Sequence, residues 1–99
     1  MPYARVGIHK FKQGTIDEVI KKGKTKLLPV DREQPGFIAY EVIKIDDETA
    51  ISISTWKTKK QAENALKRVS EWREQASIPA AVKSIDDSIG AIAFSYRSE

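Results

Sequence analysis

Apolar and polar residues along the chain repeat in two ways, one typical of strands and one typical of helices. Alternation over residues 3–11, 37–45 and 49–56 predicts three strands. Apolar positions spaced by three or four residues predict a long amphipathic helix over residues 59–76. The acidic residues 46–48 fit a hairpin turn between the second and third strands.

A second, weaker helix is predicted directly after the first strand. Thr15 is expected to cap this helix, with Glu18 three residues later completing a capping box. Gly23 weakens the helix, and Pro29 kinks or ends its regular part. Its apolar positions share a broadly common face: Ile16, Val19, Ile20, Leu27 and Leu28.

The last strand is predicted over residues 88–97, after a connector at residues 80–87 that contains the polar pair Asp86 and Asp87. Ile89, Ala91 and Ala93 alternate there with Ile92, Phe94 and Tyr96. Both faces of this strand are therefore apolar, and each face needs a cover.

The resulting order, βαββαβ, predicts an α+β, ferredoxin-like fold with a four-stranded antiparallel sheet and two helices on one face. We expect a single domain over residues 1–99. Because the helices cover only one face of the sheet, the sheet of a second copy is the simplest cover for the other, which predicts a homodimer.

Composition limits the possible functions. The chain has 99 residues, of which 40% are hydrophobic and 31% charged, and no apolar run approaches the length of a membrane span. It contains no cysteine, and its start lacks the pattern of a secretory signal, so a cytoplasmic location is expected. The net charge of +3 comes with lysines spread along predicted helix faces. We interpret these lysines as solvated, and we expect neither a nucleic-acid nor a membrane partner.

RNA-binding modules share the βαββαβ order and are an alternative. Their third strand carries a basic residue, glycines and stacked aromatic residues. The third strand here, residues 49–56, has one aromatic residue at its end and no glycine. The sequence therefore disfavours an RNA-binding module.

Three segments of the sequence carry a resemblance to a known family. They are Pro-Gly-Phe-Ile-Ala-Tyr-Glu at residues 35–41, Ser-Thr-Trp-Lys-Thr-Lys-Lys-Gln-Ala at 54–62, and Asp-Asp-Ser-Ile-Gly-Ala-Ile-Ala-Phe-Ser-Tyr at 86–96. Over essentially its full length the chain resembles the antibiotic biosynthesis monooxygenase family, within the dimeric α/β-barrel superfamily. The resemblance implies a pocket between helices and sheet that binds small aromatic or polyketide-like compounds. Some members oxidise such compounds with molecular oxygen and no metal or flavin.

Relatives in the haem-degrading branch of this superfamily carry an asparagine, a tryptophan and a histidine at three places that fall here on Gly7, on Ala65 and close to Gln75. All three side chains are missing, and the only histidine of the chain, His9, lies outside the second helix. The comparison disfavours haem, and no cofactor or metal is expected.

Candidate site residues are few. His9 titrates near neutral pH when unperturbed, so it is the candidate general base, although it also fits an ordinary strand residue. Tyr40 and Tyr96 could donate to a ligand or lie buried with their hydroxyls at an edge. Trp56 and Trp72 are candidates for the pocket wall, and both also fit core positions.

These residues favour a cofactor-independent monooxygenase acting on a small aromatic or polyketide-like compound. The alternative is a non-catalytic homodimeric domain that binds or senses a small molecule with the same fold. Arg73, together with its acidic neighbours, is expected on a solvated helix face.

Overall fold

The computed structural model describes residues 1–98, which form four strands and three α-helices joined by short turns. In chain order the elements are β1 (Tyr3–Phe11), α1 (Ile16–Lys22), the π-helical turn η1 (Gly23–Leu27), α2 (Leu28–Asp31), β2 (Phe37–Lys44), β3 (Thr49–Trp56), α3 (Lys59–Gln75), the 3₁₀ turn η2 (Ile78–Ala80) and β4 (Val82–Ala91).

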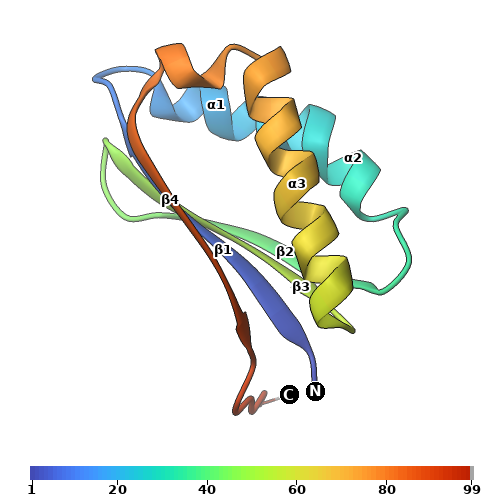
Figure 1. Cartoon of the computed structure of the whole chain (residues 1–99). Helices are drawn as coiled ribbons and strands as arrows, with labels where there is room; N and C mark the ends of the chain where they lie inside the picture. The colour runs from blue at the N-terminus through green and yellow to red at the C-terminus, as the bar shows by residue number, and fades with distance from the viewer. Residues whose placement is uncertain (99) are drawn as a thin grey trace.

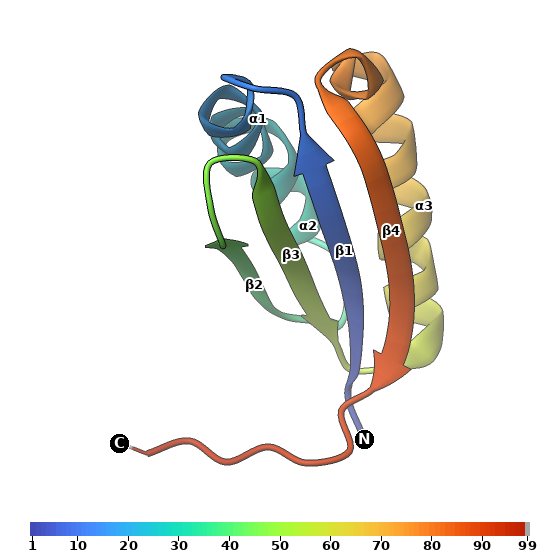
Figure 2. The ribbon, with the colours of Figure 1, turned by 90° about the vertical axis from the view of Figure 1, so that its left-hand side faces the viewer.

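The four strands form one antiparallel sheet in the order β2-β3-β1-β4. The helices lie together on one face of this sheet (Figures 1 and 2). Helix α3 runs along the sheet, α1 covers the end near the β2–β3 hairpin, and α2 lies farther from the hairpin, beside α3. This arrangement confirms the predicted ferredoxin-like α+β fold.

The face of the sheet that meets the helices carries polar as well as apolar side chains. Strand alternation brings Arg5, Gly7, His9 and Phe11 of β1 to this face, and all four residues are buried. A core of Phe11, Ile16 and Ala50 lies at one end of the sheet. A second core lies at the other end and contains Trp56, Ala62 and Ala65.

The long helix α3 begins with a capping box that the sequence analysis did not identify. The Thr58 hydroxyl accepts from the Gln61 backbone N–H at 3.2 Å, and the Gln61 side chain accepts from the Thr58 backbone N–H at 3.1 Å. The capping box predicted for the first helix is wrong, because no side-chain bond caps α1. The Thr15 hydroxyl instead donates to the carbonyls of Lys12 at 2.8 Å and Ala81 at 2.9 Å.

The last strand begins earlier than predicted. It spans Val82–Ala91, where the sequence analysis expected residues 88–97, and the chain from Ile92 to Ser98 is not a strand. Ile85, Asp87 and Ile89 are the half-buried positions of β4 on the helix side, opposite His9, Gly7 and Arg5 in the register. Asp87 forms an ion pair with Arg73 on the helix side of the sheet, which explains why an acidic residue lies within the strand.

The other face of the sheet carries apolar side chains on the three adjacent strands β2, β3 and β1. We call it the outer sheet face and define it by five residues: Val6, Ile8, Ile43, Ile51 and Ile53. Ile8 and Ile43 are 39% and 44% exposed. No helix covers this face, which is turned to the viewer in Figure 2.

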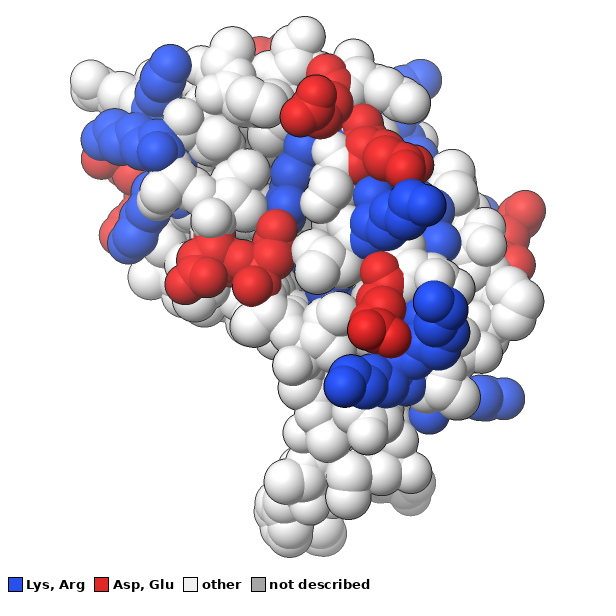
Figure 3. Space-filling model, viewed as in Figure 1, with Lys and Arg blue, Asp and Glu red and all other residues white. Residues whose placement is uncertain are grey.

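Residues 92–98 continue from β4 as an extended tail that leaves the sheet (Figure 2). Phe94 and Tyr96 of this tail are 86% and 80% exposed. The bottom of the molecule in Figure 3, where Figure 1 places both ends of the chain, shows mainly uncharged residues. Figure 3 shows the side of the molecule that carries β4 and α3, where acidic and basic side chains are interspersed without a continuous basic stripe.

Candidate functional site

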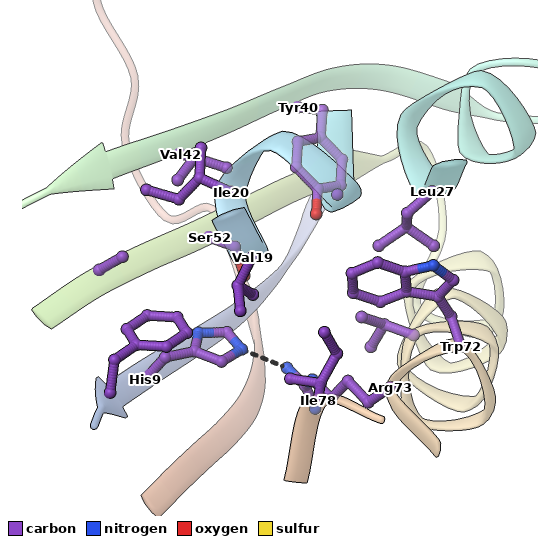
Figure 4. A pocket seen from close by; sticks show the side chains of 14 residues that line it. His9, Val19, Ile20, Leu27, Tyr40, Val42, Ser52, Trp72, Arg73 and Ile78 are labelled. Atoms are coloured by element: carbon purple, nitrogen blue, oxygen red, sulfur yellow. Dashed lines mark hydrogen bonds between the residues drawn. The ribbon is translucent and has the colours of Figure 1, made fainter. Parts of the chain in front are cut away.

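A cavity lies between the sheet, α1 with η1, and α3 (Figure 4). The cavity has a volume of about 50 Å³. This volume is smaller than the roughly 150 Å³ that accommodates benzene in an engineered apolar cavity. The lining is mostly apolar and includes Phe11, Val19, Ile20, Leu27, Trp72 and Ile78.

Four polar side chains reach the cavity from three different strands and from α3. His9 comes from β1, Tyr40 from β2, Ser52 from β3 and Arg73 from α3. In Figure 4 the Tyr40 hydroxyl points toward the space enclosed by the apolar residues, and His9 and Arg73 meet at its opposite side. The cavity is therefore apolar over most of its wall, with a few convergent polar groups, as ligand sites usually are.

Arg73 is the centre of a buried polar cluster. Its Nη1 donates to Asp87 Oδ2 at 2.6 Å, and its Nη2 donates to Asp87 Oδ1 at 3.0 Å, which makes the ion pair bidentate. The same Nη2 lies 2.9 Å from Nε2 of His9. Because a guanidinium can only donate, His9 Nε2 accepts this bond, and the imidazole is neutral with its proton on Nδ1.

Arg5 lies beside this cluster and is fully buried. Its Nε donates to Ser54 Oγ at 3.1 Å and its Nη2 to Ser52 Oγ at 3.2 Å. Its Nη1 is 4.0 Å from Asp87 Oδ1, too far for a hydrogen bond. The Arg5 guanidinium also lies 6.0 Å from the centre of the Tyr40 ring. Arg5 thus places a second buried charge directly behind the Ser52 and Tyr40 edge of the cavity.

The environment changes the proton affinities of these groups. Burial lowers the pKa of His9 to about 4, and the positive charge of Arg73 adds to this effect. Burial raises the pKa of Tyr40 and lowers that of Arg5. Burial alone would raise the pKa of Asp87, but its hydrogen bonds and charge interaction with Arg73 outweigh burial and hold that pKa below its ordinary value.

A second ion pair ties α2 to α3 next to the cluster. Arg68 Nε donates to Asp31 Oδ1 at 2.7 Å, and the Arg68 guanidinium stacks 5.4 Å above the centre of the Trp56 ring. Asp31 is almost fully buried, and this burial raises its pKa although Arg68 opposes the shift. The pair fixes the C-terminal end of the segment that covers the cavity.

The structure brings three of the five predicted site residues to the cavity. His9, Tyr40 and Trp72 line it. Trp56 is buried elsewhere, where its Nε1 donates to Ser54 Oγ at 2.9 Å. Tyr96 is exposed on the tail, away from the cavity.

The sequence analysis missed Arg73, Asp87 and Arg5. The solvated face predicted for Arg73 is wrong, because the side chain is buried. A signal was present: Arg73 lies four residues after the buried Val69, on the stripe of α3 that faces the sheet. Asp87 likewise alternates with Ile85 and Ile89, which identifies it as a residue on the helix side of β4.

Residues 1–98 contain no group of three or more histidine, cysteine, aspartate or glutamate side chains placed to hold a metal ion. Within the same residues, none of the helices combines the length and hydropathy needed to span a membrane.

The chain is similar to known proteins at the level of structure. No protein-family model matches the sequence, and the search of curated proteins found no significant match. Among solved structures, a monooxygenase from the gene ActVA-Orf6 of Streptomyces coelicolor, in complex with nanaomycin D, has a TM-score of 0.78 at 14% identity, covering 98% of this chain and 92% of that one.

Two further structures agree with this match. A variant of SnoaB, a cofactor-independent oxygenase from Streptomyces nogalater, has a TM-score of 0.75 at 11% identity, with 98% of both chains covered. A predicted antibiotic biosynthesis monooxygenase from Nitrosomonas europaea has a TM-score of 0.73 at 14% identity, covering 93% of this chain and 91% of that one. The fold that the sequence resemblance implied is therefore confirmed: the chain has the fold of the antibiotic biosynthesis monooxygenases.

Proposed function

We propose that the protein is a cofactor-independent monooxygenase that oxidises a small aromatic or polyketide-like compound in the cavity. The observation that carries this proposal is the cavity itself, an apolar space that four polar side chains reach, with His9 and Arg73 meeting on one side and the Tyr40 hydroxyl on the opposite side. A mostly apolar ligand with a few polar substituents matches this lining. The fold shared with monooxygenases, one of them named cofactor-independent, supports the same reaction class.

The chemistry needs only the substrate and oxygen. An electron-rich substrate that loses a proton from a hydroxyl or methylene group forms a stabilised anion, which can transfer electrons to O₂. In the net reaction a methylene group becomes a carbonyl, one oxygen atom enters the product and the other leaves as water with the two hydrogens. The substrate supplies all the electrons, so the balance requires no external reductant. The contribution of the protein is a dry site that holds and ionises the substrate.

Ligand access requires the cavity to widen. The wall formed by α1 and η1 is the best candidate to move, because η1 is a π-helical turn, a rare conformation that is frequent at functional sites. Gly23 begins this turn and lines the cavity, and a side chain there would approach only Trp72, at 3.9 Å. We therefore place ligand access at η1.

Oxygen consumption tests the proposal. The purified protein is mixed with a panel of hydroquinones and anthrone-like compounds, and O₂ uptake is followed with an electrode. We expect uptake above the spontaneous rate for at least one compound, with no added metal or flavin and no change on adding a chelator. Uptake at the spontaneous rate across the whole panel would contradict the proposal.

One observation favours a second function, a non-catalytic domain that binds a small molecule. His9 was the candidate base, but its Nε2 lone pair is engaged by Arg73 and its pKa is about 4. A group of this kind is a poor acceptor of protons at neutral pH. Ligand binding without any O₂ uptake would establish this second function in place of the first.

We also propose that two copies of the chain associate through the outer sheet face. This proposal no longer rests on the last strand, since Phe94 and Tyr96 lie on the tail and not in β4. It is supported by the exposed isoleucines Ile8 and Ile43 and by a tail whose two large apolar side chains have no cover within residues 1–98. In a symmetric dimer, the outer sheet face and the tail of each protomer can be covered by the same surfaces of its partner.

A cytoplasmic location and a single domain over residues 1–99 are proposals as well. The absence of cysteine is compatible with a reducing compartment. All four strands belong to one sheet, which supports a single folding unit. Detection of the protein in the culture medium or in the membrane fraction of lysed cells would contradict the cytoplasmic location. Two separate unfolding transitions would contradict the single domain.

A further inference from the structure

Positive charge exceeds negative charge in the interior around the cavity. Two buried arginines, Arg5 and Arg73, lie beside a single carboxylate, Asp87, whereas the Arg68–Asp31 ion pair does not line the cavity and adds no net charge. The His9 imidazole adds no charge, because it accepts a hydrogen bond from Arg73. Burying an uncompensated charge is costly, so an arrangement of this kind is usually completed by a counterion or by a ligand.

The positive groups also have hydrogen-bond donors to spare. Among residues 1–98, Nη1 of Arg5 and Nε of Arg73 are buried and have no hydrogen-bond partner. Each unsatisfied buried donor destabilises the fold, and such groups in a native protein call for an explanation. Of the two residues, only Arg73 lines the cavity, so an oxygen atom of a ligand that carries negative charge could accept from Arg73 Nε and also balance the surplus positive charge.

Gly7 has no side chain, and the polar cluster packs directly against its backbone. A Cβ atom at Gly7 would lie 2.8 Å from Asp87 Oδ1 and 3.1 Å from both Arg5 Nη1 and His9 Cε1. Any side chain at this position would therefore displace the polar cluster. The absence of a side chain lets the two arginines and Asp87 approach one another behind the cavity wall.

We propose that the cavity binds its ligand as an anion, namely an ionised phenol or enol whose oxygen lies beside Arg73, with Arg5 buried behind Ser52. The apolar body of the ligand would pack against Phe11 and Trp72 on the remaining wall. That this ligand is an oxygenase substrate rests on the proposed function, whereas its binding as an anion does not.

This inference assigns the ionisation step to the arginines instead of a histidine base. The surplus positive charge lowers the pKa of a phenol bound beside it, and the proton leaves to solvent as the anion binds. His9 then acts as a positioning residue that holds Arg73 through Nε2. The other charged or titratable groups that interact with Arg5 or Arg73 are Tyr40 on β2, Asp87 on β4 and, farther away, Asp31 on α2.

Binding of 4-nitrophenol tests the inference without any turnover, because only the anion of this compound absorbs strongly in the visible range. The probe is titrated with excess protein at a series of pH values under anaerobic conditions, and nitrobenzene serves as the neutral analogue. We expect the apparent pKa of the bound probe to fall by at least about one unit, which corresponds to at least a tenfold preference for the anion. We also expect nitrobenzene to bind at least tenfold more weakly.

Three variants separate the charge of the cluster from general damage to the fold. Arg73→Gln should abolish most of the pKa shift of the probe. Lys67→Gln makes the same charge change on an exposed position of α3 and should leave the shift intact. Asp87→Asn removes a negative charge instead, so it should keep or increase the shift. Far-UV circular dichroism verifies that each variant is folded, and the wild-type titration decides the question alone if a variant is not.

The outcomes are distinguishable from those of the oxygen-uptake experiment. An unshifted pKa of the bound probe, equal affinity for nitrobenzene, or no binding of the probe at millimolar concentration would overturn the inference. A shifted pKa together with no O₂ uptake would leave anion binding established and would remove the monooxygenase function.

Discussion

At the scale of single residues, the chemistry of the cavity depends on how Arg73 divides its donors between Asp87 and His9. The bidentate bond to Asp87 orients the guanidinium, and the bond to His9 Nε2 fixes the neutral form of the imidazole. Protonation of His9 would place a third positive charge beside Arg5 and Arg73. The cluster therefore opposes the protonation that a general base must undergo.

The first prediction is that His9 stays neutral down to a pH of about 4. A histidine in an unfolded chain has a pKa of about 6.5, so between these values the unfolded chain binds more protons than the folded one. The free energy of unfolding should therefore fall as the pH drops from about 6.5 to about 4, by up to roughly 3 kcal/mol. NMR titration of the His9 ring gives its pKa directly.

His9→Gln provides the control for this prediction, because glutamine can still accept a bond from Arg73 but does not titrate. Its free energy of unfolding should depend less on pH between about 4 and 6.5, while Asp31 and Asp87 contribute equally in both proteins. A measured pKa near 6.5 for His9 would show that Arg73 does not engage it in solution.

Gly7 supports a second prediction at this scale. Gly7→Ala places a methyl group 2.8 Å from Asp87 Oδ1, so the free energy of unfolding should fall by about 1–3 kcal/mol. The methyl group of Gly90→Ala, on the neighbouring strand β4, would meet no atom within 4 Å. This substitution should change the free energy of unfolding by less than about 0.5 kcal/mol. Urea unfolding of both variants makes the comparison, and equal effects would mean that the space at Gly7 is not restricted.

At the scale of elements, the segment from α1 to α2 is not one regular α-helix, because the π-helical turn η1 lies between the two. Pro29 has no backbone N–H, and the chain before it forms the π-helical turn η1, in which Leu28 N donates to Gly23 O. The sequence analysis identified Gly23 and Pro29 as weak points of one helix. It could not predict that the irregularity lies over a cavity, because that depends on Trp72 of α3.

A third prediction concerns this turn. Gly23→Ala adds a good helix former in a helical conformation and an ordinary contact with Trp72 at 3.9 Å. The free energy of unfolding should rise by about 0.5–1 kcal/mol. Association of 4-nitrophenol should become slower, since the stiffer wall opens less often, and stopped-flow mixing measures this rate. Unchanged association with raised stability would place ligand access elsewhere.

Periodicity predicted the strands β1 to β3 and helix α3 almost to the residue, because their apolar faces repeat regularly. It failed for β4, where an acidic pair resembled a turn and the apolar tail resembled a strand. The difference arises because Asp87 is stabilised by Arg73, a partner fourteen residues away that the local pattern does not contain. The same kind of distant pairing explains why the polar cluster of the site was missed while His9, Tyr40 and Trp72 were found.

At the scale of the whole molecule, one of the two faces of the sheet has no cover. The helices protect one face, and the outer sheet face presents a row of branched apolar residues to solvent. The tail adds Phe94 and Tyr96 at the end of the sheet. A soluble monomer rarely exposes an apolar surface of this extent, so association is the simplest solution.

The fourth prediction is a mass near twice 11.1 kDa by sedimentation at micromolar concentration. Ile8→Glu on the outer sheet face should shift the protein to monomer, because it buries a charge in the interface. Val30→Glu makes a similar change on α2, where the side chain is 47% exposed, and should leave the dimer intact. A monomeric wild-type protein would refute the proposed association.

The proposed oxygenation is tested most directly by isotope labelling. The protein is mixed under ¹⁸O₂ with the compound from the panel that gives the highest O₂ uptake, and the product is analysed by mass spectrometry. A monooxygenase predicts a single ¹⁸O atom in the product and the other in water. Product without ¹⁸O, or no product beyond the spontaneous reaction, would contradict the account.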